Sequence, residues 1–203
     1  MERVNPPRSR RQERAPAEPG RLPLLPAPPP YRMPADPGAL LAAAFAEPAV
    51  PEQPPSPPPA RPGPLRHPPE VYRELEAIYR GVDRAIAALG PRCERRGLCC
   101  DFDRVDHVLY ASQLEIDYVR DHVPPARYLL PSGNACPFLH QGQCTARAVR
   151  MLGCRTYFCQ QGWEALGAEI YERALGRLKA LAARHGLGWR YAPALELLRE
   201  ESS

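Results

Sequence analysis

The sequence contains no apolar run long enough to cross a bilayer, and its last two thirds contain very little proline. A membrane-spanning helix needs about 20 consecutive apolar residues, and no stretch of this chain approaches that length. Of the 28 prolines, 22 fall within residues 1–69 and only 6 within residues 70–203. We therefore expect no membrane association, and a chain made of two parts that meet near residue 70.

The chain also lacks a strong excess of charge of one sign. The net charge is +4 over 203 residues, which gives no reason to expect a nucleic-acid partner. Nor do we expect export, because several prolines separate the arginine pair Arg10-Arg11 from the short apolar run at residues 39–46. The expected location is cytoplasmic, where cysteines are more often metal ligands than disulfides.

Residues 1–69 have the composition of a disordered proline-rich tail. The tracts at residues 26–30 and 54–59 favour extended polyproline II, because each proline ring fixes φ and removes a backbone donor. Their P-x-x-P spacings are those of ligands for groove-binding proteins, so a protein partner is one expectation for the tail. A short helical turn or docking segment over residues 39–46 is an alternative to disorder there.

Residues 70–203 carry helical periodicity instead. Apolar residues at steps of three and four predict one helix over residues 71–89 and a longer one over residues 163–181. Gly90-Pro91 ends the first helix, and Gly186 follows the second. Trp163 and Trp189 are expected to be packing residues.

Ser112 and Glu115 have the spacing of a capping box, which predicts a further helix over residues 113–121. Three shorter segments are expected as well: helices over residues 145–152 and 194–200, and a short strand or extended segment over residues 103–110. The predicted fold class is therefore mainly α. It is a small helical domain over residues 70–203 with irregular, metal-stapled cysteine loops, preceded by the disordered tail.

All seven cysteines lie within that domain, at Cys93, Cys99, Cys100, Cys136, Cys144, Cys154 and Cys159. Thiolates are the usual ligands of structural zinc and of iron–sulfur clusters. Four glycines precede cysteines by one to three residues, namely Gly97, Gly133, Gly142 and Gly153. Because glycine permits tight turns with positive φ, such loops can wrap an ion. We therefore predict that the seven cysteines are metal ligands, although the adjacent pair Cys99-Cys100 need not share one ion.

Arginines are frequent near these cysteines. Four thiolates around zinc or an oxidised four-iron cluster leave a net charge near minus two by valence, which guanidinium groups would offset. Arg150 and Arg155 are the predicted cofactor-binding arginines. A surface role is expected for each of three histidines, His107, His122 and His140. The alternative is that one of them completes a second zinc site, for which His140 is the most plausible ligand by proximity.

The cysteine pattern resembles that of the YkgJ-type cysteine-cluster family, a zinc- or iron-chelating domain named for a C-x2-C-x2-C-C motif. Cys93, Cys99 and Cys100 match that motif, whereas Arg96 stands at its second cysteine position. The family's later segment is matched by Cys136, Pro137, Leu139, Cys144, Arg150, Cys154 and Arg155. The resemblance covers residues 93–159 and implies a metal or iron–sulfur centre, and it leaves an enzymatic role open.

Two functions fit these observations. The first is an iron–sulfur protein that transfers electrons, and the alternative is a structural zinc module that binds a partner without redox activity. Gaps of five, seven and nine residues between cysteines are looser than paired C-x2-C zinc knuckles, which favours iron–sulfur. The sequence contains neither a G-x-G-x-x-G loop nor a C-x-x-C redox motif, so no reaction is assigned.

Overall fold

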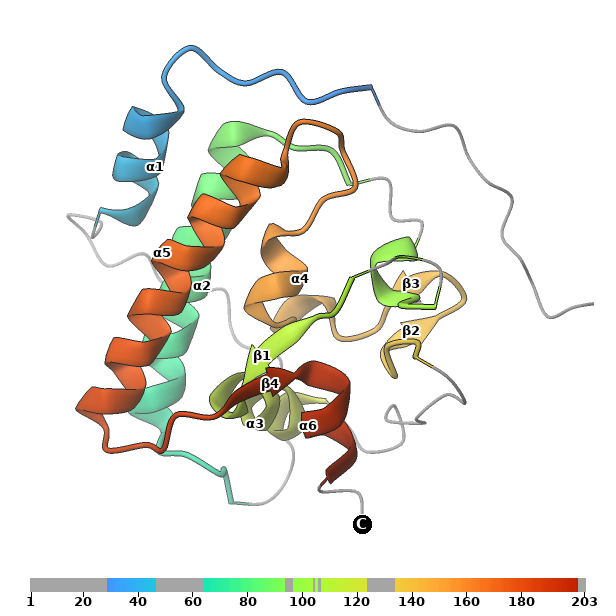
Figure 1. Ribbon diagram of the computed structural model, residues 1–203. Helices are drawn as coiled ribbons and strands as arrows, with labels where there is room; N and C mark the ends of the chain where they lie inside the picture. Colours follow the sequence, from blue (N-terminus) through green and yellow to red (C-terminus); the bar gives the residue numbers. More distant parts are fainter. Residues whose placement is uncertain are drawn as a thin grey trace, which may run out of the picture.

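Two long antiparallel helices, α2 (Pro69–Leu89) and α5 (Glu164–Arg184), form one side of the molecule (Figure 1). The computed structural model describes residues 29–46, 64–93, 97–103, 105, 107–123 and 134–200. In these parts of the chain six α-helices accompany two small two-stranded sheets. The prediction of a mainly α fold is therefore confirmed. No helix in the described ranges is both long and apolar enough to cross a membrane.

The two long helices form as their apolar periodicity predicts. Val71, Leu75 and Val82 lie on the buried face of α2, and Ile170 and Leu178 lie on that of α5. Each helix ends next to a glycine in the left-handed conformation: Gly90 has φ 67° and Gly186 has φ 63°. In that region of φ a glycine avoids the steric cost that a Cβ would bring.

Helix α3 (Gln113–His122) begins with the predicted capping box. The Ser112 side chain accepts a hydrogen bond from the Glu115 amide, and the Glu115 carboxylate accepts one from the Ser112 amide at 2.8 Å. The same buried carboxylate accepts from the Tyr79 hydroxyl at 3.1 Å and from the Leu152 amide at 2.7 Å. It thereby connects α2, α3 and the start of α4 (Leu152–Thr156).

Two short strands pair at the end of the segment for which the sequence predicted a short strand or extended backbone. β1 (Tyr110–Ser112) pairs antiparallel with β4 (Tyr191–Pro193), so only the last residue of the predicted segment 103–110 lies in a strand. α6 (Ala194–Glu200) follows β4 as predicted. It is held on α3 because Arg120 donates hydrogen bonds to the Leu197 and Leu198 carbonyls.

The predicted helix over residues 145–152 is wrong. The chain there forms a single 3₁₀ turn at Arg147–Val149, then extended backbone at Arg150 and Met151, and then α4. Contacts with residues outside the segment oppose a helix there: the Arg155 guanidinium donates to the Ala148 and Arg150 carbonyls, and the Glu115 carboxylate accepts from the Leu152 amide. A helix through residues 145–152 would need those groups for its own ladder.

The expectation of a disordered tail over residues 1–69 needs correction at residues 29–46. Helix α1 (Pro37–Phe45) packs along α2, and its Leu41 is fully buried. Arg177 of α5 donates to the Phe45 carbonyl and Arg84 of α2 donates to the Ala44 carbonyl. The docking alternative for residues 39–46 is therefore the correct one. Residues 1–28 and 47–63 lie outside the described residues, so the predictions for them stay untested.

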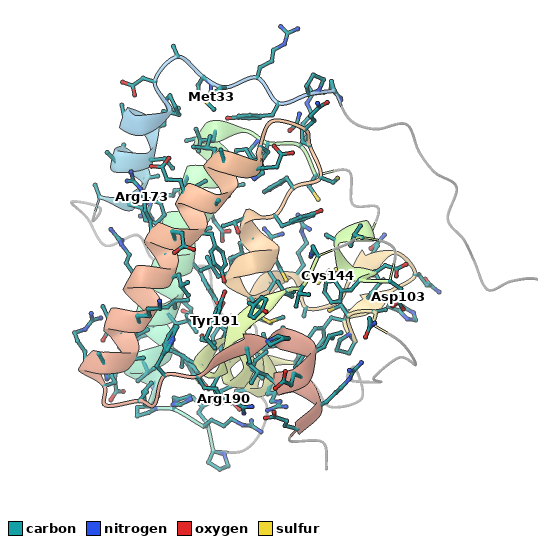
Figure 2. All side chains as sticks on the ribbon, in the orientation of Figure 1. Met33, Asp103, Cys144, Arg173, Arg190 and Tyr191 are labelled. Atoms are coloured by element: carbon teal, nitrogen blue, oxygen red, sulfur yellow. The ribbon has the colours of Figure 1, made fainter. Side chains whose placement is uncertain are left out.

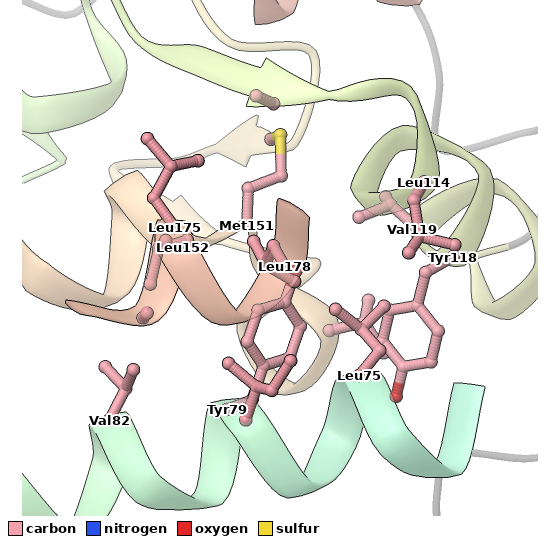
Figure 3. Packing of buried hydrophobic residues seen from close by; sticks show 14 of the residues in the cluster. Leu75, Tyr79, Val82, Leu114, Tyr118, Val119, Met151, Leu152, Leu175 and Leu178 are labelled. Carbon is pink, nitrogen blue, oxygen red and sulfur yellow. The ribbon is translucent and has the colours of Figure 1, made fainter. Parts of the chain in front are cut away.

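The core lies between α2, α5, α4 and α3 (Figure 3). Leu75, Tyr79 and Val82 of α2 face Leu178 of α5, with Met151 beside them at the start of α4. Trp163 is buried in the core, whereas Trp189 is 38% exposed and packs at the surface, where it stacks on Tyr191. On the far side of α4 from the long helices lie the cysteine-bearing loops and the hairpin of β2 (Leu139–His140) and β3 (Gln143–Cys144) (Figure 1).

Candidate metal centre

Six of the seven cysteines line one small cavity of about 60 Å³: Cys93, Cys99, Cys100, Cys136, Cys144 and Cys154. Cys100 and Cys136 are buried, Cys144 and Cys154 are half-buried, and Cys93 and Cys99 are exposed. Cys144 is labelled in Figure 2, beside the loops that surround this cavity. The chain therefore brings together thiols that are up to 61 residues apart in sequence.

Tight glycine turns place two of the cysteine segments against each other. Gln141 and Gly142 have φ 49° and 75°, as in a type I′ turn, and they join the two strands of the hairpin that ends at Cys144. Gly97 has φ 71°, and a Cβ there would lie 2.8 Å from the Gly142 carbonyl oxygen. The expectation that glycine turns shape the cysteine loops is thus confirmed at Gly97 and Gly142.

Gly153 differs from that expectation, because it lies inside α4 and has no positive φ. A Cβ on Gly153 would lie 2.6 Å from the Leu109 side chain. Glycine is therefore needed there for close packing of α4 on the segment before β1, and this packing brings Cys154 to the cavity. Gly133 lies outside the described residues.

Backbone hydrogen bonds join the segment of Cys99 and Cys100 to that of Cys136. The Cys136 amide donates to the Cys100 carbonyl at 2.7 Å, and Asp101 and Ala135 form a β-bridge. Cys99 and Cys100 lie in the 3₁₀ turn Leu98–Cys100, and their sulfur atoms are 3.9 Å apart. Because this backbone is not extended, both thiols line the same cavity, although neighbours on a strand would point to opposite sides.

The surroundings of these thiols favour their neutral form. Burial raises the pKa of Cys154 well above its ordinary value, and the nearby sulfur atoms of Cys100 and Cys144 add to the rise. A hydrogen bond with Cys136 is the main cause that raises the pKa of Cys100 to about 12. Burial also raises the pKa of Cys144. A thiolate cluster in this cavity therefore needs a cation to compensate it.

Of the two predicted cofactor-binding arginines, Arg150 lines the cavity and Arg155 does not. The Arg155 guanidinium lies over the Tyr79 ring, 4.1 Å from its centroid, and forms an ion pair of 2.6 Å with Asp83. Arg147, one of the arginines that lie near the cysteines in sequence, lines the cavity beside Arg150. Arg155 instead holds the backbone next to Arg150, because it donates to the Arg150 carbonyl at 2.9 Å.

Cys159 and the three candidate histidines differ in whether they line the cavity. Cys159 is exposed and is not among the residues that line the cavity. His107 lines the cavity, whereas His140 is exposed on the hairpin. His122 packs against the Tyr118 ring and bonds the Tyr118 carbonyl at 2.7 Å. Proximity in sequence to a cysteine was thus a poor guide to which histidine is nearest the site.

The donor set fits a thiolate-bound metal or cluster in its chemistry, because soft sulfur ligands suit zinc and iron–sulfur centres alike. The rest of the wall is largely apolar and includes Leu109, Val119 and Phe138. Within the described residues, no group of three or more His, Cys, Asp or Glu side chains is already arranged to hold a metal ion. The structure thus provides a common cavity for the thiols, without a preformed ligand geometry.

Comparison with known proteins identifies no relative: no family model, no curated protein and no solved structure matches this chain.

Proposed function

We propose that the cysteine cavity binds a thiolate-ligated cofactor, an iron–sulfur cluster in the first place, and that the protein transfers electrons. The observation that carries the proposal is the convergence of six cysteines, from separate segments of the chain, on one cavity. A free cysteine can pack as a small apolar side chain, but six around a shared space exceed what packing requires. The resemblance to YkgJ-type cysteine-cluster proteins agrees with this proposal.

The four more enclosed cysteines are the best candidates for ligands: Cys100, Cys136, Cys144 and Cys154. They come from the 3₁₀ turn Leu98–Cys100, the segment before β2, strand β3 and helix α4, so a bound group would cross-link four separate short segments. Cys93 and Cys99 lie on the exposed side of the cavity, where they can serve as further ligands. Cys159, predicted as a ligand from sequence, is the candidate with least support because it lies outside the cavity lining.

Arg147 and Arg150 would offset the negative charge of the thiolates, since both line the same cavity. Burial lowers the pKa of Arg150, with Arg155 and Arg147 adding to the effect, so negative charge in the cavity would stabilise this cluster of guanidinium groups. A bound iron–sulfur cluster would supply a reversible electron couple. The apolar wall formed by Leu109, Val119 and Phe138 would limit access of water to it.

The alternative is a zinc module with a structural role. It is favoured by the scarcity of regular structure around the cysteines: the described residues from 134 to 151 contain two strands of two residues each and one 3₁₀ turn. In small metal domains the ion supplies folding energy that a core of this kind cannot. Zinc would give the protein a rigid binding surface and no redox activity.

Metal and acid-labile sulfide analysis of the full chain, purified without oxygen and without a metal-binding tag, separates the two functions. The electron-transfer proposal predicts a coloured protein that contains iron and sulfide and whose visible spectrum bleaches on reduction by dithionite. Stoichiometric zinc in a colourless protein would support the structural alternative. A full chain that is folded but contains neither iron nor zinc would overturn both functions.

A further inference from the structure

A second hollow lies next to the cysteine cavity. It is a groove of about 390 Å³, and the two spaces share His107, Leu109, Gly153, Tyr157 and Phe158 as common lining. Aromatic side chains form much of the groove: Tyr110, Tyr157, Phe158, Trp163, Tyr171 and Tyr191. The groove therefore lies over one wall of the candidate metal centre, but it is lined by none of the cysteines.

Several apolar side chains of this groove are unusually exposed. Val108 is 62% exposed, Tyr110 is 43% exposed and Tyr157 is 39% exposed. Exposed large apolar side chains around one groove are typical of a surface that binds another polypeptide segment or a ligand. Grooves lined by aromatic rings are the usual receptors for proline-rich segments, because a polyproline II helix is already ordered and its proline rings pack flat against tyrosine and tryptophan.

The chain itself carries such a segment to this place. The Tyr31 ring packs edge-on against Trp163, with ring centroids 5.0 Å apart, and Trp163 is part of the groove lining. The backbone at this point is held by two hydrogen bonds, from the Tyr31 amide to the Gln161 carbonyl at 2.7 Å and from the Gln160 side chain to the Pro29 carbonyl at 2.9 Å. Residues 29–31 are thus fixed at the groove's Trp163 end.

The residues that precede this anchor have the composition such a groove requires. Residues 22–30 read Leu-Pro-Leu-Leu-Pro-Ala-Pro-Pro-Pro, without a single charged side chain. Seven residues in polyproline II span roughly 22 Å at about 3.1 Å per residue. Because the tether between anchor and segment is so short, the local concentration of the segment at the groove is in the millimolar range, on the order of 1 mM or more.

We propose that residues 22–28 bind in this aromatic groove as an intramolecular ligand. Leucine and proline side chains of the segment would cover the exposed faces of Val108, Tyr110 and Tyr157. The proposal does not depend on which group, if any, the neighbouring cysteine cavity holds.

Photocrosslinking in the full chain tests this arrangement. Benzoylphenylalanine placed at Ala27 should crosslink, within one chain, to peptides that contain Tyr110 or Tyr191. The same residue placed at Ser56, in the second proline tract, is the matched control and should not label those peptides. Equal labelling from both positions, labelling from Ala27 of peptides elsewhere, or no labelling from Ala27 would overturn the proposal, as would crosslinks between two chains.

A pair of substitutions on α5 checks that the groove itself is responsible. Ala168 is exposed and lines the groove, whereas Ala165 is exposed on the same helix and does not line it. Ala168→Arg should fill the groove and abolish the Ala27 crosslink, while Ala165→Arg should leave its yield unchanged. Circular dichroism of both variants establishes that they fold alike. A crosslink that survives Ala168→Arg would contradict binding in the groove.

Discussion

At the scale of single residues, Glu115 connects three helices through one buried carboxylate. Its carboxylate is 1% exposed and accepts hydrogen bonds from Tyr79, Ser112 and the Leu152 amide. The last of these fixes the first turn of α4, two residues before Cys154. Glu115 is therefore a positioning residue for the cysteine cavity, although it does not line it.

Removal of this carboxylate should be costly, because four buried donors would lose their acceptor: the Tyr79 and Ser112 hydroxyls and the Ser112 and Leu152 amides. We expect Glu115→Ala to lower the free energy of unfolding by about 3 kcal/mol, measured by urea denaturation of the full chain. The matched control is Glu172→Ala on the exposed face of α5, which should change stability by no more than about 0.5 kcal/mol. Similar effects of the two substitutions would contradict the structural role of Glu115.

At the scale of elements, the sequence predicts best where local signals are sufficient. The apolar periodicity of α2 and α5 and the capping box of α3 act within one turn or two, so their ends agree with prediction to within a few residues. β4 escapes prediction because its pairing with β1 joins residues about 80 positions apart. The helix expected over residues 145–152 fails for a similar reason, since Arg155 and Glu115 bind its backbone groups.

Helix α1 provides a direct test of the corrected domain boundary. Leu41 is 0% exposed in its contact with the rest of the core, so Leu41→Ala should destabilise the full chain by about 3 kcal/mol. Met33, which is 56% exposed, is the control position, where substitution by alanine should have an effect within about 0.5 kcal/mol. If wild type and Leu41→Ala have equal urea midpoints, residues 29–46 belong to the tail and the corrected domain boundary is wrong.

The contact of Arg66, in the segment before α2, with Asp121 of α3 should make the free energy of unfolding depend on pH. Asp121 is buried, which tends to raise its pKa, but hydrogen bonds from Tyr72 and from the Arg66 backbone and side chain outweigh this and lower it. The unfolded chain then takes up a proton at Asp121 before the folded one does, so stability is lost as pH falls below about 4. In urea titrations between about pH 5 and pH 3, Asp121→Asn should show a shallower loss of stability than wild type. Identical slopes would contradict the assignment.

At the scale of the whole molecule, the candidate site was predictable as a set of residues but not as an arrangement. The density of cysteines in residues 93–159 identified six side chains that line the cavity. Spacing in sequence could not distinguish Cys159 and Arg155 from the residues that line the cavity, because it does not reveal the direction in which a side chain points. Arg155 forms an ion pair with Asp83, which is 72 residues away, whereas Arg147 lines the cavity three residues after Cys144.

The most direct test of the metal centre compares the metal and sulfide content of two cysteine variants of the full chain. Cys154 lines the cavity on α4, and Cys159 lies outside the lining five residues later. The account predicts that Cys154→Ser loses most of the bound metal whereas Cys159→Ser retains the wild-type content. Equal metal content in wild type and both variants, or loss only in Cys159→Ser, would contradict it.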